Sequence, residues 1–326
     1  ANNPAARSRA ALSNVAPIAA AVDFPYSQEN SDMTLVSSST PVPVGPAVTS
    51  VPVRDGSLMP ITTRPDPVFI RGAGSYLWDH DGRRYLDFVQ GWAVNALGHC
   101  PVELRAALEM QAGLLITPSP AYDNAPALAL ASRLRALSGL HQVHFANSGA
   151  EANEAAVKLA RKWGKTRGNG RHEIITTDNG FHGRTLAMMA ASGKPNWADL
   201  FPPAVPGFRK VTFGDLEAAR SAVGPHTLAL MVEPVQGEAG VIVPPEGYLR
   251  GLRALADEHG LLLILDEVQT GVGRTGTFFA YQAAGVLPDI VTLGKGLGGG
   301  VPVSAMIAAE RVCCFVPGDQ GGTFNG

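Results

Sequence analysis

The sequence predicts an α/β fold in which a mostly parallel central sheet is flanked by helices. Short apolar runs that suit buried strands alternate along the chain with segments of helical periodicity. Several of these runs end directly in charged residues, as a buried strand does where it leaves the core of a parallel sheet. Alternation of this kind is typical of parallel strands connected by helices.

The elements follow in order along the chain. Residues 75–88 predict two short strands around an Asp-Gly turn. A helix is expected from Ala125, with Asn124 as its cap and Pro126 in its first turn. Further helices are expected over EANEAAVKLARKW and in a segment that ends at Gly260. The runs that predict strands are, as written in the sequence, VHFA, IITT, LALMV, LLLIL, IVTL and PVSAMIA.

Composition excludes several classes of protein. The 326 residues are 45% hydrophobic and 17% charged, which is a globular composition with room for one large domain or two smaller ones. A net charge of -2 gives no reason to expect a nucleic-acid partner, and no apolar run approaches the roughly 18 residues of a membrane span. Two of the three cysteines are adjacent, which argues against a disulfide framework and predicts a reducing, cytoplasmic setting.

The chain is expected to have three parts. Residues 1–58 are rich in Ala, Ser, Pro, Val and Thr and predict a low-complexity, disordered extension; Met59 would be the true start if this part were an over-long gene start. A targeting peptide is the alternative, because no acid precedes Asp23, but two arginines alone support it weakly. Residues 59–115 form an N-terminal segment, and residues 116–326 form the large α/β domain.

Polar residues gather where the predicted strands end. Asn147 to Ala150 follow VHFA, Glu233 follows LALMV, Asp266 ends LLLILD, and Lys295 follows IVTLG. Ligands of parallel α/β sheets bind beyond the carboxyl ends of the strands. An anion cradle, two acids and a lysine at one edge predict a site for a ligand that carries a phosphate, a positive ring nitrogen and a carbonyl carbon.

The cradle is the turn formed by Ser148, Gly149 and Ala150 at the start of a predicted helix. Free backbone N–H groups and the positive end of the helix dipole suit a phosphate there. The alternative is plain helix capping by Asn147 or Ser148, supported by a glutamate in the first turn.

Lys295 follows a buried run and is surrounded by glycines, so the backbone can approach a ligand closely. A partly desolvated lysine has a lowered pKa, as an amine that forms a Schiff base requires. The alternative is a lysine that neutralises Asp266 or Asp289. The same glycines match G-x-G-x-x-G, but Pro302 and two valines follow where a dinucleotide-binding site would begin a helix, so that reading fails.

Asp266 suits the nitrogen of a pyridine ring, because a facing carboxylate keeps that nitrogen protonated and the ring electron-withdrawing. Gln269 is placed to hydrogen-bond a ring oxygen, Phe181 to cover the ring, and Arg184 to bind a carboxylate. The alternatives are a core phenylalanine and a surface arginine. No metal site or catalytic triad is predicted, because HExxH, CxxC and GxSxG are absent from the sequence.

Taken together, these segments resemble the class III aminotransferases, which are pyridoxal 5'-phosphate enzymes of fold type I. The resemblance covers most of the chain from about Met59 onward, in the family's order. The motifs that carry it are NALGHC, FANSGAEANEAAVKLARKW, GFHGRT, VEPVQGEAGV, DEVQTGVGRTG and TLGKGLGGGVPV.

The resemblance implies a set of cofactor contacts. Lys295 would hold the cofactor covalently and move the substrate proton, and Asp266 would hold the ring nitrogen. Thr323 would reach the phosphate of the partner subunit, so a homodimer is implied. The full set of implied cofactor-binding residues is Ser148, Gly149, Ala150, Phe181, Asp266, Gln269, Lys295 and Thr323.

The resemblance also implies a reaction, the transfer of the terminal amino group of N-acetylornithine to 2-oxoglutarate in arginine biosynthesis. Arg184 would bind the substrate α-carboxylate with Gly322 nearby, and Glu238 resembles an acid that pairs with a C-terminal arginine in related enzymes. Ornithine and 4-aminobutyrate are alternative donors, while Glu238 disfavours the related glutamate-1-semialdehyde aminomutases.

Two features depart from the family pattern. GHCP stands where the family has GHxHP, and the chain ends at GGTFNG, before the family's NP motif and the C-terminal arginine. A truncated small domain is therefore expected. The alternative function is a chain that binds the cofactor without catalysing transfer.

Overall fold

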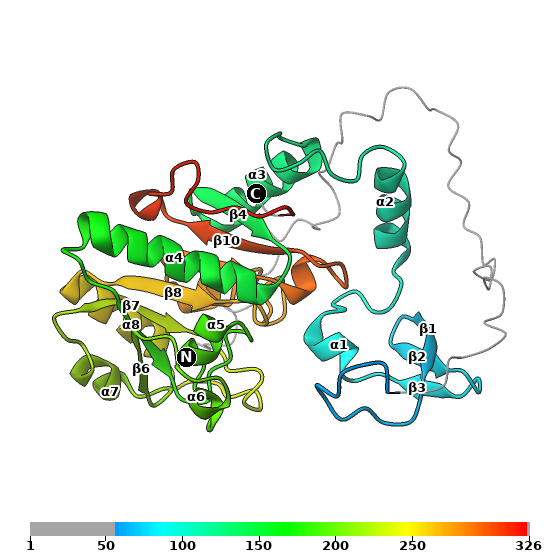
Figure 1. The fold of residues 1–326 in the computed structure, drawn as a ribbon, viewed down its shortest axis with the longest axis horizontal. Coiled ribbons are helices and arrows are strands. Elements are labelled where there is room, and N and C mark those ends of the chain that lie inside the picture. Colours follow the sequence, from blue (N-terminus) through cyan, green and yellow to red (C-terminus); the bar gives the residue numbers. More distant parts are fainter. Residues whose placement is uncertain (1–55, 325–326) are drawn as a thin grey trace, which may run out of the picture. The chain divides into compact units, whose positions relative to one another are not determined.

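The computed structural model describes residues 56–324 of the chain (Figure 1). The chain divides into two units, residues 1–59 and 60–326. Nearly all of the first unit, and with it the predicted disordered extension of residues 1–58, lies outside the described residues. The expected boundaries of the three parts remain predictions.

A seven-stranded sheet forms the centre of the second unit, in the order β4-β10-β9-β8-β7-β5-β6. Its strands are β4 (Gln142–Ala146), β5 (Glu173–Thr177), β6 (Phe208–Val211), β7 (Thr227–Val232), β8 (Leu262–Asp266), β9 (Ile290–Leu293) and β10 (Ser304–Ala308). All neighbours are parallel except those of β10, which runs antiparallel to β4 and β9. The connection from β9 to β10 is too short for a crossover, which takes a dozen or more residues, so β10 must turn back. The predicted α/β fold with a mostly parallel sheet is confirmed.

Helix boundaries follow local capping signals. The helices are α1 (Gln90–Ala93), α2 (Val102–Ala112), α3 (Ala125–Ser138), α4 (Gly149–Arg167), α5 (Leu186–Ala191), α6 (Trp197–Leu200), α7 (Leu216–Ser221), α8 (Tyr248–His259) and α9 (Ala280–Ala284), with short 3₁₀ turns at η2 (Lys295–Leu297) and η3 (Glu310–Val312). Asn124 caps α3 through a 2.9 Å bond from the Ala127 N–H, and α8 ends at Gly260, whose φ of 60° favours glycine. Both predicted boundaries are confirmed. Among the helices of residues 56–324, none has the length and apolar character that a membrane span requires.

The sheet is covered on both faces, because successive side chains of each strand point to opposite sides. In β8, Leu262 and Ile264 pack into the cluster that contains Leu159 of α4, whereas Leu263 and Leu265 pack into the cluster of α3, α7 and α8. Figure 1 shows α4 and α8 on opposite faces of the strands. Each fully buried leucine contributes about 1.5–3 kcal/mol. The two packed layers hold the carboxyl ends of the strands in fixed positions.

The N-terminal segment contains a small antiparallel sheet of β1 (Phe69–Ala73), β2 (Tyr76–Asp79) and β3 (Arg84–Leu86). β2 and β3 are the two strands predicted around an Asp-Gly turn. The Asp79 carboxylate closes this turn by accepting the Tyr85 O–H at 2.8 Å and the Arg83 N–H at 2.8 Å.

Candidate active site

The ends of three neighbouring strands bring polar side chains to one edge of the sheet. β7, β8 and β9 are adjacent and parallel. Asp266 is the last residue of β8, Glu233 directly follows β7, and Lys295 lies two residues beyond β9. Residues far apart in the sequence therefore share this carboxyl edge, as the strand pattern predicted.

Asp266 is buried, with 3% of its surface exposed, and its carboxylate is held by hydrogen bonds from three groups. Oδ2 accepts the Asn153 Nδ2–H at 2.8 Å and lies 2.7 Å from His182 Nδ1. Oδ1 accepts the Val268 N–H at 3.0 Å. Among the described residues, no lysine or arginine forms an ion pair with Asp266. Burying a carboxylate without a fixed cation costs free energy unless the carboxylate is hydrogen-bonded. Asp266 is therefore suited to bind a cationic group of a ligand.

A further layer of contacts fixes the groups that hold Asp266. Thr292 in β9 donates to Asn153 Oδ1 at 2.7 Å, and Asn153 Nδ2 also donates to the His182 carbonyl at 2.8 Å. His182 Nε2 is buried without a hydrogen-bond partner in the structure. Within residues 56–324 this ring is therefore held through Nδ1 and its contact with Asp266.

Lys295 begins the 3₁₀ turn η2 with a φ of 44°, and its side chain is half-buried. Within residues 56–324 its ammonium group makes no hydrogen bond or ion pair. Burial lowers the pKa of Lys295, and the negative charges of Asp266 and Glu233 partly oppose that change. The lowered pKa favours the neutral amine that a nucleophile needs.

The start of α4 combines capping with free donors. The Ser148 hydroxyl accepts the Glu151 N–H at 3.3 Å, and Glu151 Oε2 accepts the Ser148 N–H at 2.7 Å, which forms a capping box. The capping alternative is therefore present. It leaves the N–H groups of Gly149 and Ala150 without an acceptor among the described residues, so capping and an anion cradle coexist.

Close packing places this helix start beside the lysine loop. A Cβ atom at Gly149 would lie 2.6 Å from Val268 Cγ1, and one at Gly294 would lie 3.5 Å from Gly149 Cα. Gly183 has a φ of 135° and packs equally closely on Ala150. The segments that contain Asp266, Lys295 and the GFHGRT motif therefore meet at the N-terminus of α4.

Phe181 and Arg184 lie together in an aromatic and cationic cluster. The Phe181 ring meets the Trp197 ring edge-on at 5.9 Å between centroids. The Arg184 guanidinium carbon lies 5.0 Å from the Trp197 centroid and 6.0 Å from that of Phe181. Stacking of this kind orients a guanidinium while leaving its N–H groups available to a carboxylate.

Glu233 connects two loops of the site through hydrogen bonds to their backbone N–H groups. Its Oε1 accepts the Phe181 N–H at 2.9 Å, and its Oε2 accepts the Gly237 N–H at 3.3 Å. Burial raises the pKa of Glu233, and the nearby charge of Asp266 raises it further. Gln269 packs against Gly237, where a side chain would overlap it. The sequence identified Glu233 as a strand-end acid but gave it no role.

Some predicted site residues lie elsewhere or have other partners. Glu238 forms an ion pair with Lys194. Gly322 and Thr323 are exposed, and the structure records no contact between them and the residues above. Their proposed contacts with substrate and with a partner subunit remain predictions.

Three residues of this region were missed from the sequence. His182 lies inside the GFHGRT motif, but its contact with Asp266 joins positions 84 residues apart. Asn153 is a polar residue on the buried alanine face of α4, which was a usable signal. Lys194 had no local signal, because it lies in a loop between α5 and α6.

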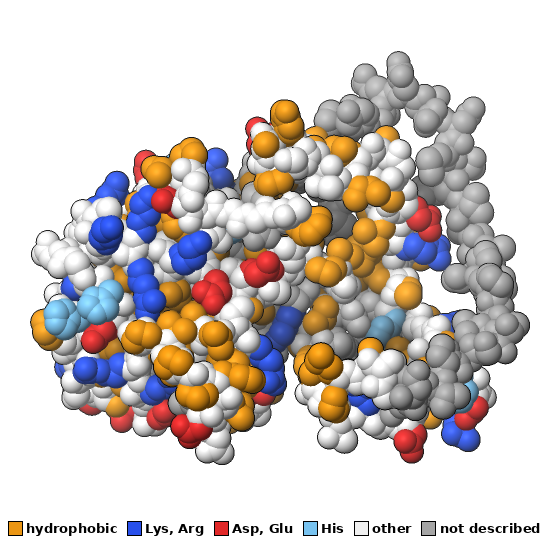
Figure 2. Space-filling model, in the orientation of Figure 1, with side chains coloured by type: hydrophobic (Ala, Val, Ile, Leu, Met, Phe, Trp, Pro, Cys, Tyr) orange, Lys and Arg blue, Asp and Glu red, His pale blue; other side chains and the backbone are white. Residues whose placement is uncertain are grey.

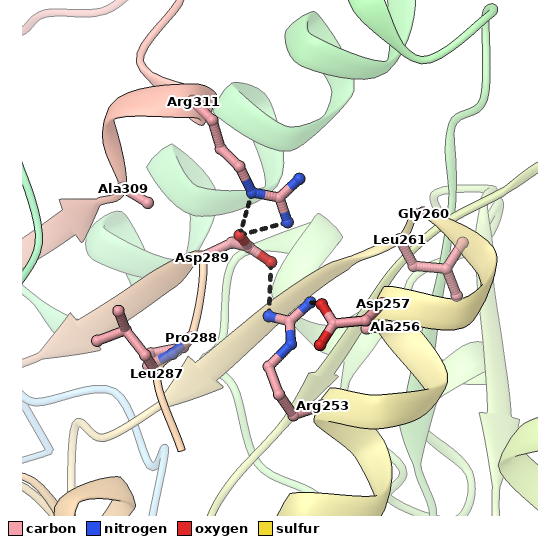
Figure 3. Close-up of a pocket in the computed structure, with 10 residues that line it drawn as sticks. All are labelled: Arg253, Ala256, Asp257, Gly260, Leu261, Leu287, Pro288, Asp289, Ala309 and Arg311. Carbon is pink, nitrogen blue, oxygen red and sulfur yellow. Dashed lines mark hydrogen bonds and ion pairs between the residues drawn. The ribbon is translucent and has the colours of Figure 1, made fainter. Parts of the chain in front are cut away.

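A separate pocket of about 410 Å³ lies at the opposite edge of the sheet (Figure 3). Asp289 precedes β9 there and accepts Arg253 Nη1 at 2.9 Å, Arg311 Nε at 2.7 Å and the Leu263 N–H at 2.9 Å. The charges that line it are paired with one another, as the dashed lines in Figure 3 show. The Asp289 carboxylate is thus paired with arginines, and the structure records no ion pair between it and Lys295.

Comparisons with known proteins agree with this geometry. Residues 62–326 match the family model of class-III aminotransferases. The chain is 60% identical over 270 residues to acetylornithine aminotransferase 2 of Bordetella bronchiseptica. The aligned region covers 83% of the chain and 68% of the relative. It is 50% identical to the acetylornithine aminotransferase of Methanopyrus kandleri, with 83% and 67% covered.

Solved structures give the same result. The ornithine aminotransferase of Toxoplasma gondii ME49 matches with a TM-score of 0.79 at 35% identity, covering 82% of the chain and 65% of that protein. The N-acetylornithine aminotransferase of Stenotrophomonas maltophilia K279a matches with a TM-score of 0.67 at 41% identity, covering 76% and 64%. The chain spans about two thirds of the length of these relatives. The predicted resemblance is confirmed: the chain belongs to the class III aminotransferases.

Proposed function

We propose that the chain is a pyridoxal 5'-phosphate-dependent aminotransferase that moves the terminal amino group of N-acetylornithine to 2-oxoglutarate, a reaction of arginine biosynthesis. One observation carries the proposal. An unpaired lysine and a buried aspartate without a lysine or arginine partner lie on the same carboxyl edge of a parallel sheet. The curated relatives named above support N-acetylornithine as the donor.

The side chains and N–H groups at this edge fit the cofactor. The unoccupied donors of Gly149 and Ala150 suit its phosphate, and Asp266 suits its ring nitrogen. The exposed part of Phe181 suits a ring face, and Lys295 suits a covalent link. When bound, the cofactor supplies a protonated ring that withdraws electrons from the reacting carbon of the substrate.

Residues of the chain itself transfer the proton, hold the cofactor ring and bind the substrate carboxylate. Lys295 Nζ, whose neutral form is favoured by burial, accepts and returns the proton of the reacting carbon. Asn153 and His182 fix the position and the hydrogen bonding of the Asp266 carboxylate, which would hold the ring nitrogen. Arg184 binds the substrate carboxylate in an orientation set by its stacking on Trp197.

The experiment that tests this function is a transfer assay on the purified chain with added pyridoxal 5'-phosphate. N-acetylornithine and 2-oxoglutarate should yield glutamate, whereas ornithine and 4-aminobutyrate should yield less. The Lys295→Ala variant is the control. Cofactor capture without glutamate from any donor would favour the alternative of a non-catalytic chain, and a faster rate with ornithine would favour the alternative donor.

We further propose that the chain acts as a homodimer. Large hydrophobic side chains of the N-terminal segment are strongly exposed, including Phe88 at 89% and Ile61 at 82%, and hydrophobic side chains gather around α1 and α2 in Figure 2. Extended apolar surface of this kind is typical of interfaces. Light scattering should give twice the 34.0 kDa mass of one chain, and Phe88→Asp should reduce it. A single-chain mass for the unmodified protein would contradict the proposal.

A cytoplasmic location is part of the same proposal. Cys100, Cys313 and Cys314 are all free in the structure. Free thiols are typical of a reducing compartment. Localisation of a tagged chain by cell fractionation tests it.

A further inference from the structure

We propose that Glu267 is a positioning residue of this site: its carboxylate closes the loop of residues 268–279, and that loop supports the groups that bind the cofactor. The inference rests on the proposed function, because its consequence is the affinity for that cofactor. Glu267 directly follows Asp266, but its side chain contacts the start of α9 instead of the groups that hold Asp266.

The side chain of Glu267 joins the two ends of the loop. It is fully buried, with 0% of its surface exposed. At the beginning of the loop, the Thr270 hydroxyl donates to Oε2 at 3.2 Å. At the end of the loop, the N–H groups of Ala280 and Tyr281 donate to Oε2 at 2.7 Å and to Oε1 at 3.0 Å. One carboxylate therefore fastens the start of the loop to the start of α9.

The backbone of Glu267 holds the same loop against the sheet. Its N–H donates to the Thr292 carbonyl of β9 at 3.0 Å, and its carbonyl accepts the Gly271 N–H at 3.0 Å. A Cβ atom at Gly271 would lie 2.4 Å from Leu293 Cδ2, so the loop packs directly on β9. The three side-chain donors share a single acceptor group, so its loss would release both ends of the loop at once.

The first residues of the loop contact the groups that suit the cofactor ring and phosphate. The Val268 N–H donates to Asp266 Oδ1 at 3.0 Å, and a Cβ atom at Gly149 would lie 2.6 Å from Val268 Cγ1. A Cβ atom at Gly237 would overlap the side chain of Gln269. The position of the loop therefore affects the acid for the ring nitrogen, the phosphate cradle and the amide that is expected at the ring oxygen.

The later residues of the loop reach the lysine and the N-terminal segment. A Cβ atom at Gly296, next to Lys295, would lie 3.6 Å from Val272 Cβ. Arg274 Nη2 donates to the Ala93 carbonyl at 3.3 Å. A loosened loop should therefore disturb the lysine as well as the aspartate.

The test is a spectrophotometric titration of Glu267→Gln with pyridoxal 5'-phosphate. The amide keeps one acceptor oxygen but turns its own N–H groups toward backbone donors. The affinity should fall roughly tenfold or more, as for a lost charge-assisted hydrogen bond, and the long-wavelength absorbance band of the bound cofactor should shift. Thr270→Val removes only one of the three donors and should give a smaller change in the same direction.

Tyr281→Phe is the matched control, because it weakens the same helix without touching the loop. It removes the hydrogen bond from the Tyr281 hydroxyl to the Ser138 carbonyl at 2.9 Å, and it keeps the Tyr281 N–H on Glu267. Its unfolding free energy should fall, since a buried carbonyl loses its donor. Its cofactor affinity and absorbance band should stay those of the unmodified chain.

The inference is overturned if Glu267→Gln binds the cofactor as tightly as the unmodified chain, or if Tyr281→Phe weakens binding to the same extent. The proposed function can fail separately. If Glu267→Gln alone weakens cofactor binding but no donor yields glutamate with the unmodified chain, the proposed function fails and the positioning role of Glu267 stands. If glutamate forms and both variants bind the cofactor alike, the function stands and the positioning role fails.

Discussion

Asp266 and Asp289 are both buried at edges of the central sheet, but their carboxylates are satisfied in opposite ways. Asp289, at the amino edge, is paired with Arg253 and Arg311 (Figure 3). Asp266, at the carboxyl edge, receives hydrogen bonds from Asn153 and His182, while Lys295 remains unpaired on the same edge. Matched charges indicate a structural role, whereas an acid and a lysine kept apart indicate a site prepared for a ligand.

The largest expected effect concerns the free lysine. Lys295→Ala should reduce glutamate formation by about 10³-fold or more, because it removes both the nucleophile and the proton carrier. The unfolding free energy should not fall in parallel, since burial already opposes the charge of this lysine. Initial rates and denaturant titrations measure the two effects. A Lys295→Ala variant that keeps its activity would contradict a catalytic role for the carboxyl edge of the sheet.

The two aspartates should separate stability from activity. Asp289→Asn leaves Arg311 without a carboxylate and Arg253 with only that of Asp257, and should lower the unfolding free energy by about 3 kcal/mol. Asp266→Asn keeps one acceptor for the groups that hold it and should cost about 1–3 kcal/mol, yet it should lower amino transfer by about 10²-fold. If both variants lost the same unfolding free energy and Asp266→Asn left amino transfer unchanged, the two aspartates would not differ in role.

Glu267, the neighbour of Asp266, shows a third way to satisfy a buried acid. Its carboxylate accepts the N–H groups of Ala280 at 2.7 Å and Tyr281 at 3.0 Å, and burial raises its pKa to about 7. The folded state therefore holds this proton up to about pH 7, whereas the unfolded state releases it near the ordinary pKa of 4.5, so this residue stabilises the protein less as pH rises from 5 to 8.

Relative to Glu267→Gln, the unmodified chain should lose about 2–3 kcal/mol of unfolding free energy over that pH interval. Denaturant titrations of both proteins at several pH values give the difference. Parallel pH profiles would mean that this carboxyl titrates alike in the folded and unfolded states.

The smallest expected effect concerns the helix that begins at the carboxyl edge. Ser148→Ala removes the side-chain half of the capping box and should lower the unfolding free energy by about 1 kcal/mol. Ser148→Asn retains a capping acceptor and should recover most of that loss. An unchanged denaturation midpoint in Ser148→Ala would show that the capping box contributes nothing to stability.

Local patterns predicted much of this arrangement. The strand ends placed Asp266 and Lys295 on one edge, and capping residues placed the starts of α3 and α4. Hydrophobic periodicity carries no strand direction, so the reversal of β10 could not be seen in PVSAMIA. Asn153 reaches Asp266 across 113 residues, and Lys194 meets Glu238 between two loops. Contacts of such long range depend on tertiary packing that no local pattern encodes.

The measurement that tests the central claim most directly is the attachment point of the cofactor. The purified chain is mixed with pyridoxal 5'-phosphate, its absorbance spectrum is recorded, and borohydride is added before the labelled peptide is mapped. The account predicts a long-wavelength band and a label on Lys295 that is lost in Lys295→Ala. A missing band, or a label spread over surface lysines, would contradict it.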